Sequence, residues 1–170
     1  HNVPTLLERL FDRQDFWDVF NMQTHKVLTH LDGVGILTCV GGLSIQGNIA
    51  LTDLDGLSGL TGSVSSLALE GSALTNIDGL INLTSVEGSL SIGSSYYYCC
   101  GPSPSGGGNA LLTNIDGLIN LVSVGGSLTI GSNLSLANLD GLGSLTSVGG
   151  SLNIQTDGYD PYTGQTFGPC

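Results

Sequence analysis

The chain has 170 residues, a length that suits one domain, and three basic residues stand against fourteen acidic ones, for a formal net charge of −11. All three cations precede Val27, so ten of the carboxylates lie in a stretch without Lys or Arg. Nucleic acid and anionic lipid are both bound through basic residues, so the composition excludes them as expected partners. No apolar run approaches the roughly 20 residues that span a bilayer, so membrane insertion is not expected either.

Several features favour a secreted chain. The sequence begins at His1 rather than Met, has four cysteines and almost no Lys, and contains two N-x-[ST] sequons, at Asn82 and Asn133. An even cysteine count suits an oxidising compartment, and the missing Met suits a signal peptide that has been removed. We therefore expect an extracellular or cell-surface location, with Asn82 and Asn133 as candidate glycosylation sites.

The N-terminal segment predicts a helix. The run PTLLERLFDRQDFWDVF has Pro in its first turn, and its large apolar residues fall near one helical face. We expect helix only near residues 4–22, and we assign residues 1–26 to a helical cap over the first repeat. An amphipathic arm that docks on a neighbouring subunit is the alternative, and Trp17 and Phe20 are candidate contact residues.

Residues 27–155 contain five copies of one short repeat. The stretch LTNIDGLINLTSVEGSLSI, residues 74–92, recurs at residues 112–130 with sixteen of nineteen positions identical. An Asp-Gly pair marks every copy, and the spacings between successive pairs are 23, 23, 38 and 24 residues. The aspartates of these pairs are Asp32, Asp55, Asp78, Asp116 and Asp140.

A period in the twenties is typical of a solenoid. Each copy has three short apolar groups separated by Gly, Asn and Ser, and the last group, as in Leu128-Thr129-Ile130, alternates with the period of a strand. We expect an all-β parallel β-solenoid of about five coils of 23–24 residues, because stacked coils bury the Leu and Ile that one coil cannot. The second copy, LTGSVSSLAL, shifts the Val and lacks the Val-x-Gly corner, so we expect its rung to be irregular.

The pattern L-x-x-[LI]-D-G-L-x-x-L-x-x-V-x-G-x-L-x-I, over roughly Val27 to Gln155, resembles the receptor L domain and its microbial and protist relatives. These proteins are leucine-rich-repeat-like. The resemblance implies a right-handed β-solenoid with a binding or surface role outside the cell. It carries no catalytic motif.

Stacking places equivalent residues in columns. We interpret the Asp-Gly column as a turn, in which the Asp side chain accepts a backbone N–H and the Gly takes positive φ. A calcium stripe is the alternative, because hard cations prefer carboxylates. Each rung supplies only one carboxylate, whereas calcium sites gather several ligands. We therefore expect no metal or other cofactor.

Asn and Thr form further columns. Asn76, Asn114 and Asn138 share one position with Asp53 and His30, and we expect an inward ladder that satisfies loop backbone groups, with His30 as a structural substitute. Two Thr columns are explained by β-propensity at exposed strand positions, with ice binding as the alternative. The Thr columns are Thr29, Thr52, Thr75 and Thr113, and Thr38, Thr61, Thr84 and Thr146.

An insertion at about 94–109 separates the third and fourth copies. Its Gly, Pro and Ser content predicts a loop, and three consecutive Tyr in it are candidate contact residues, because Tyr offers apolar area with a polar tip. A loop that folds back on the solenoid wall is the alternative. The C-terminal tail, residues 156–170, is rich in turn residues and contains further candidates. Two alternatives stay open for it: it folds over the last rung, or it leaves that end for another chain. The aromatic candidates of loop and tail are Tyr96, Tyr97, Tyr98, Tyr159, Tyr162 and Phe167.

All four cysteines, Cys39, Cys99, Cys100 and Cys170, are disulfide candidates. A bond between the adjacent Cys99 and Cys100 is disfavoured by geometry. The tail and the insertion leave from the same corner, so we expect Cys170 to pair with Cys99 or Cys100. The other loop cysteine then pairs with Cys39, within the chain or across a subunit contact.

No nucleophile with a base, phosphate loop or metal-spaced Cys/His cluster is recognisable, so we expect no enzymatic activity. Terminal rungs of a solenoid expose unpaired edges. One hypothesis is therefore a structural protein that self-assembles into a fibre or surface layer through its ends and its Tyr/Cys loop, with copies of itself as partners. The other is a monomeric binding or adhesion module that recognises a protein or a glycan.

Overall fold

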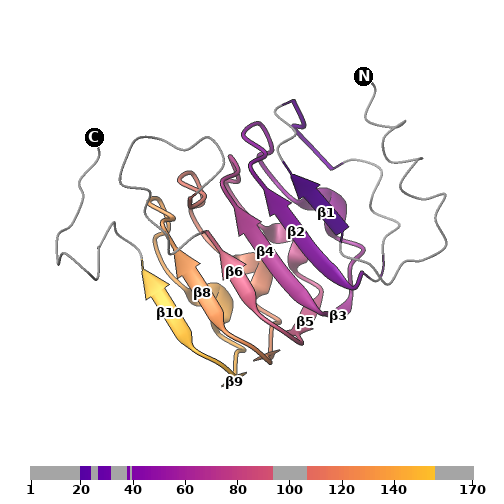
Figure 1. The fold of residues 1–170 in the computed structure, drawn as a ribbon, viewed down its shortest axis with the longest axis vertical. Helices are drawn as coiled ribbons and strands as arrows, with labels where there is room; N and C mark the ends of the chain where they lie inside the picture. The colour runs from indigo at the N-terminus through magenta and orange to yellow at the C-terminus, as the bar shows by residue number, and fades with distance from the viewer. Residues whose placement is uncertain (1–19, 24–26, 32–37, 39, 94–106, 156–170) are drawn as a thin grey trace.

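The chain folds into a parallel β-solenoid of about five turns, as the repeat predicts (Figure 1). The structure is a computed structural model, and it describes residues 20–23, 27–31, 38, 40–93 and 107–155. A complete coil places one strand in a large sheet, then a single turn of 3-10 helix, then a short strand in a small sheet. The three walls enclose one apolar core.

The large sheet has six parallel strands in the order β1-β2-β4-β6-β8-β10. Like residues stack on like: Leu90 pairs with Leu128, which in turn pairs with Leu152. Figure 1 shows the strands side by side in chain order. They are β1 (Phe20–Gln23), β2 (Gly42–Gln46), β4 (Ser66–Glu70), β6 (Leu90–Ile92), β8 (Leu128–Gly131) and β10 (Leu152–Gln155).

The small sheet has the order β3-β5-β7-β9, and its Val residues stack in register. Its register shifts between Gly62 and Ser63, and Gly62 has a φ of 81°. The predicted irregularity of the second rung is thereby confirmed. The strands are β3 (Gly62–Val64), β5 (Leu83–Val86), β7 (Ser123–Val124) and β9 (Ser147–Val148).

The third wall is a stack of 3-10 turns, one for each Asp-Gly-Leu that the structure describes: η1 (Asp55–Leu57), η2 (Asp78–Leu80), η3 (Asp116–Leu118) and η4 (Asp140–Leu142). Their Leu side chains point into the core, and those of the first three are fully buried.

The positive φ expected for the glycine of an Asp-Gly pair is wrong at the four pairs that the structure describes. None of the four glycines in these turns has positive φ. A Cβ on Gly117 would instead overlap the backbone oxygen of Ile77 in the preceding coil, and a Cβ on Gly141 would overlap that of Ile115. The glycines are needed because successive coils approach each other so closely at this wall.

The N-terminal boundary also differs from the prediction. Residues 20–22 were expected to be helical, but Phe20–Gln23 is strand β1, paired with β2 in the register Phe20 to Leu43 and Met22 to Ile45. The alternating Phe20 and Met22 repeat the apolar pattern of the later rungs, so the large sheet gains a sixth strand. Residues 1–19, which contain the rest of the predicted helix, lie outside the described residues.

Gly117→Ala is expected to destabilise the fold by roughly 3 kcal/mol, because the added methyl group would force two coils apart against backbone atoms. Gly143→Ala is the matched control: Gly143 is exposed, has a φ of −60°, and its nearest obstacle to a Cβ is the Asp140 oxygen at 3.2 Å. We expect that change to alter stability by less than about 1 kcal/mol. Urea unfolding of both variants measures the difference, and equal losses would contradict the close-approach explanation.

Candidate interaction surfaces

The Asn column at the Asp-Gly-Leu turns points outward. Each side-chain oxygen accepts a hydrogen bond from the backbone N–H two residues later, which closes an Asx turn at the start of the 3-10 turn. The expected inward ladder at these positions is therefore wrong. The four described Asp-Gly pairs do lie in turns, as expected, but the side-chain acceptor of each turn is the residue two before the Asp and not the Asp itself. The N to Oδ1 distances are 3.1 Å at Asn76, 3.1 Å at Asn114, 3.0 Å at Asn138 and 3.4 Å at Asp53.

A different set of asparagines forms the inward ladder, at the corner between the large sheet and the 3-10 wall. Asn48 and Asn109 are 0% exposed and Asn133 is 1% exposed. Each donates through Nδ2 to a backbone oxygen of an earlier rung, at 2.9–3.0 Å. Asn133 Oδ1 also accepts from the Asn109 N–H at 2.8 Å, and Asn109 Oδ1 accepts from the Ser72 N–H at 3.1 Å. This ladder satisfies buried backbone groups and is structural.

The ladder corrects two expectations. Asn133 was a glycosylation candidate, but its amide is buried and its nitrogen donates to Ile92 O, so the fold leaves no room for a glycan there. The insertion was predicted to end at about residue 109, but Gly107 already accepts a bond from the Gly71 N–H and Asn109 is core. Asn82 is exposed and donates to Ser58 O at 2.9 Å, and its glycosylation stays a prediction.

His30 shares the outward Asn position, where its Nδ1 lies 3.2 Å from Asp53 Oδ2. Thr52 donates to the same oxygen at 3.0 Å. The imidazole is 56% exposed, and a pair this open to water contributes little stability. Among the described residues, no three His, Cys, Asp or Glu side chains gather to hold a metal ion, and Asp32 lies outside them.

The Thr columns connect the rungs. Thr75 and Thr113 each donate a hydroxyl hydrogen bond at 3.1 Å to the backbone oxygen of the preceding Thr in their column. Thr84 and Thr146 donate to the preceding rung in the same way at 3.0 Å. The first column lies outside any strand, so strand propensity does not explain it. The hydrogen bonds between successive rungs explain why Thr recurs in this column.

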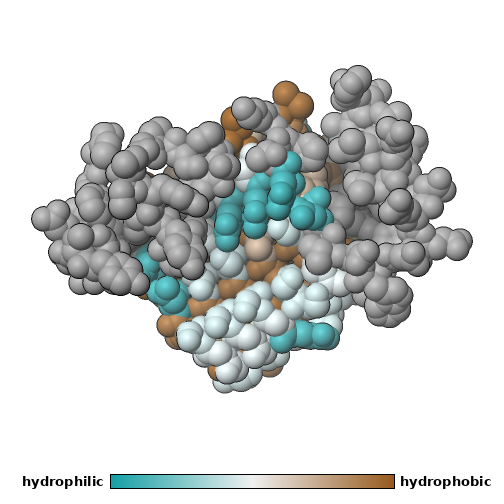
Figure 2. Space-filling model, viewed as in Figure 1, coloured by the Kyte–Doolittle hydropathy of each residue, from teal (hydrophilic) through white to brown (hydrophobic). Residues whose placement is uncertain are grey.

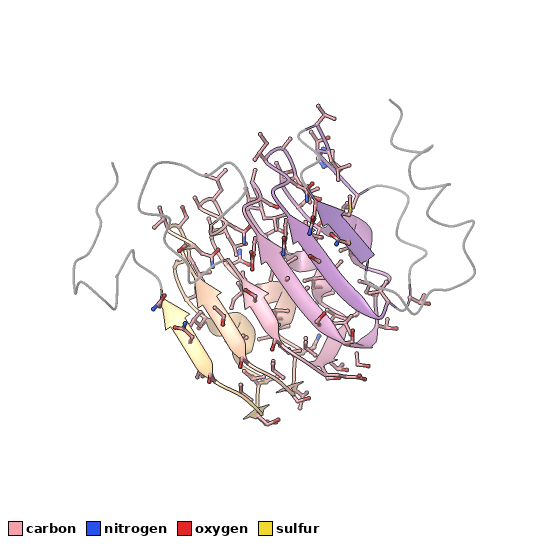
Figure 3. The ribbon with its side chains drawn as sticks, viewed as in Figure 1. Carbon is pink, nitrogen blue, oxygen red and sulfur yellow. The ribbon has the colours of Figure 1, made fainter. Side chains whose placement is uncertain are left out.

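The outward positions of the large sheet carry mostly polar side chains, such as Ser44, Ser91 and Thr129 (Figure 3). Gln23, Gln46 and Glu70 lie in register, and Figure 2 shows a hydrophilic band crossing the strands. Ser91 donates to Glu70 Oε1 at 3.3 Å.

No helix among the described residues has the length and apolar character needed to cross a bilayer.

One corner of the solenoid carries exposed apolar side chains, which we call the corner ridge: Val27, Ile49, Leu111 and Leu134. Their exposed fractions are 88%, 51%, 54% and 68%. Ile49, Leu111 and Leu134 follow a ladder asparagine by one or two residues, so they lie along the same corner of the stack, with the rung of Ser72 between Ile49 and Leu111. Apolar atoms also project at the upper edge of the view in Figure 2.

The last coil is incompletely covered. Leu152 and Ile154 of β10 are 59% and 38% exposed, whereas their partners Leu128 and Ile130 in β8 are 0% and 1% exposed. Gln155 Oε1, at the end of the same strand, is buried without a hydrogen-bond partner among the described residues. Other apolar residues of this coil are only partly buried: Leu136, Leu139, Leu142, Leu145 and Val148.

The remaining sequence candidates are not brought together here. All four cysteines and the aromatic candidates other than Phe20 lie outside the described residues, so their disulfides and contacts stay predictions. These residues are Cys39, Cys99, Cys100, Cys170, Trp17, Tyr96, Tyr97, Tyr98, Tyr159, Tyr162 and Phe167.

The chain was compared with models of protein families, with curated proteins and with solved structures, and none of the three comparisons gave a match.

Asn109→Ala is expected to cost about 2–3 kcal/mol of stability, because it leaves the buried Ser72 N–H without a partner and removes one of the two hydrogen bonds to Leu69 O, which keeps the bond from the Gly93 N–H. Asn120→Ala is the control. Asn120 also donates to a backbone oxygen of the preceding rung, Ile81 O at 2.9 Å, but it is exposed, so water replaces the bond and we expect a loss below about 1 kcal/mol. Thermal and urea unfolding measure both, and similar losses would contradict the structural ladder.

Proposed function

We propose that this chain is a non-enzymatic extracellular structural protein that assembles end to end with copies of itself. The observation that carries the proposal is the contrast between the last coil and those before it. Leu128 and Ile130 are fully buried by the next rung, whereas Leu152 and Ile154 remain exposed. Covering this end buries the exposed apolar surface, and the burial contributes about 25 cal/mol of free energy per Å².

The regularity of the rungs supports assembly rather than recognition of a foreign ligand. Successive rungs place apolar residues at the same positions, mostly Leu, Ile and Val, with Phe20 and Met22 in the first strand, so a coil of another copy has the shape that the open end accepts. A contact between unlike ends of identical chains does not close on itself, and repeated addition gives an open filament.

Composition supports the extracellular location. The chain has four cysteines, an exposed sequon at Asn82 and no Lys or Arg after Lys26. We assign it, as part of the same proposal, to the receptor-L-like and leucine-rich-repeat-like solenoids that its repeat resembles. Calcium on the Asp column is not part of the proposal.

The corner ridge favours a second candidate function, a monomeric module that binds a protein or a glycan. Exposed apolar side chains that lie near one another commonly mark contact sites. Ice binding has less support, because the hydroxyls of Thr75, Thr113, Thr84 and Thr146 are directed to backbone oxygens along the stack.

Substitution at the open end separates the two functions. Leu152→Asp places a charge where the next copy would bury a Leu, so it is expected to raise the concentration needed for assembly by at least about tenfold. Leu134→Asp is the matched control, because Leu134 is at least as exposed as Leu152, 68% against 59%, but lies on the corner ridge. We expect it to assemble like the wild type. Light scattering over a concentration series and negative-stain microscopy provide the measurement.

Two outcomes would contradict the proposal. A wild-type chain that stays monomeric at high concentration would favour the binding module. Loss of assembly in Leu134→Asp but not in Leu152→Asp would show that copies meet through the corner ridge and not through the ends.

A further inference from the structure

We infer that β10 of one copy pairs in parallel with β1 of the next, so that the large sheet runs through the joint with Gln155 beside the second copy's Gln23. The inference rests on the proposed end-to-end assembly and specifies the contact that produces it. It places Leu152, Asn153 and Ile154 beside Phe20, Asn21 and Met22 of the second copy.

The residue pattern of the two terminal strands supports this register. β1 reads FNMQ and β10 reads LNIQ. In β2, which reads GLSIQ, the four residues that pair with β1 are LSIQ. Between β1 and β2 the register is Phe20 to Leu43, Met22 to Ile45 and Gln23 to Gln46. The same register at the joint stacks apolar on apolar, Asn on Asn and Gln on Gln. Stacked amides of this kind form hydrogen-bonded ladders between parallel strands.

Both terminal strands lack the features that prevent edge pairing. Soluble proteins usually protect an edge strand with a charge, a Pro or a bulge. Neither Phe20–Gln23 nor Leu152–Gln155 contains a charged residue or Pro, and the charged residue of the large sheet, Glu70, lies in the interior strand β4. No described residue pairs with the outer edge of either strand.

Among the described residues, no amide side chain lies beside Gln155 on the neighbouring strand of its own chain. It pairs with Gly131, which has no side chain, and its Oε1 is buried without a hydrogen-bond partner among the described residues. In the proposed register, the Nε2 group of the second copy's Gln23 lies one strand away and can donate to this oxygen. Leaving such an acceptor buried and unpaired is costly, so its satisfaction favours the joint.

Paired charge substitutions test the register. In the chain Gln23→Lys/Gln155→Lys, two cations would face each other about 4.8 Å apart at every joint, and assembly is expected to need at least about tenfold more protein. The chain Gln23→Glu/Gln155→Glu should be impaired equally. An equimolar mixture of the two should assemble near the wild-type concentration, because every joint then pairs Lys with Glu.

The matched control is Gln46→Lys/Gln155→Lys, which adds the same charge but places one Lys a rung further from the joint. Salt screens the repulsion between two Lys at that longer separation. The protein concentration needed for assembly is therefore expected within about threefold of the wild-type value. Circular dichroism and thermal unfolding of each monomer establish that the variants fold. Recovery on mixing supplies a second safeguard, because misfolded chains would not regain assembly.

The outcomes separate the joint from the proposed function. If the wild type assembles and the two double variants assemble equally well alone, end-to-end pairing of β10 with β1 is wrong, although self-assembly stands. The same conclusion follows if the double variants are impaired but mixing restores nothing. A wild-type chain that stays monomeric overturns both.

Discussion

The close approach of one coil to the next determines most of this structure. Parallel backbone pairing holds coils about 4.8 Å apart, and at that distance each position in a coil faces its own equivalent. A residue that fits one rung must therefore fit against a copy of itself. The requirement is strictest at the Asp-Gly-Leu turns, where successive coils come so close that only glycine fits. At three of these turns, the space of a Cβ on the glycine is already occupied by a backbone oxygen of the preceding rung, that of Leu54, Ile77 or Ile115.

The same constraint explains where the polar residues lie. A corner that turns inside a tight stack buries backbone N–H and C=O groups, and these need partners from within the chain. Asn48, Asn109 and Asn133 provide them inside the corner, while Thr hydroxyls provide them along the outer edges. The open last coil is the other consequence, because a repeating stack has no intrinsic end.

The sequence allowed the coil number, the strand at the last apolar group of each copy and the irregular second rung to be predicted, because the period and the Leu, Ile and Val spacings are direct consequences of stacking. Strand β1 was missed, although FNMQ followed four residues later by LTHLDG has the spacing of LSIQ followed by LTDLDG. The amphipathic pattern upstream extended the helix prediction over it. A comparison of the first rung with the second would have found the strand.

The asparagines were harder to assign. Both sets recur with the repeat, so periodicity does not distinguish an outward Asx turn from an inward ladder. The outward set precedes an Asp-Gly, where an Asx turn is common. The inward set precedes Leu by three residues, as in Asn109 and Leu112, and its burial depends on how the corner packs. Sequence alone does not show this burial, so the triplet at Asn133 was interpreted as a glycosylation sequon although its side chain belongs to the inward ladder.

The axial repeat of assembled wild-type chains, measured by fibre diffraction or electron cryomicroscopy, tests the continuous stack most directly. Six strands per copy, about 4.8 Å apart along the filament axis, predict a subunit advance of about 29 Å with the strands perpendicular to that axis. An advance of about 40 Å would contradict the account, because it would place a layer of helix, about 10 Å thick, between β10 and the next β1. Strands that run parallel to the filament axis would also contradict the account.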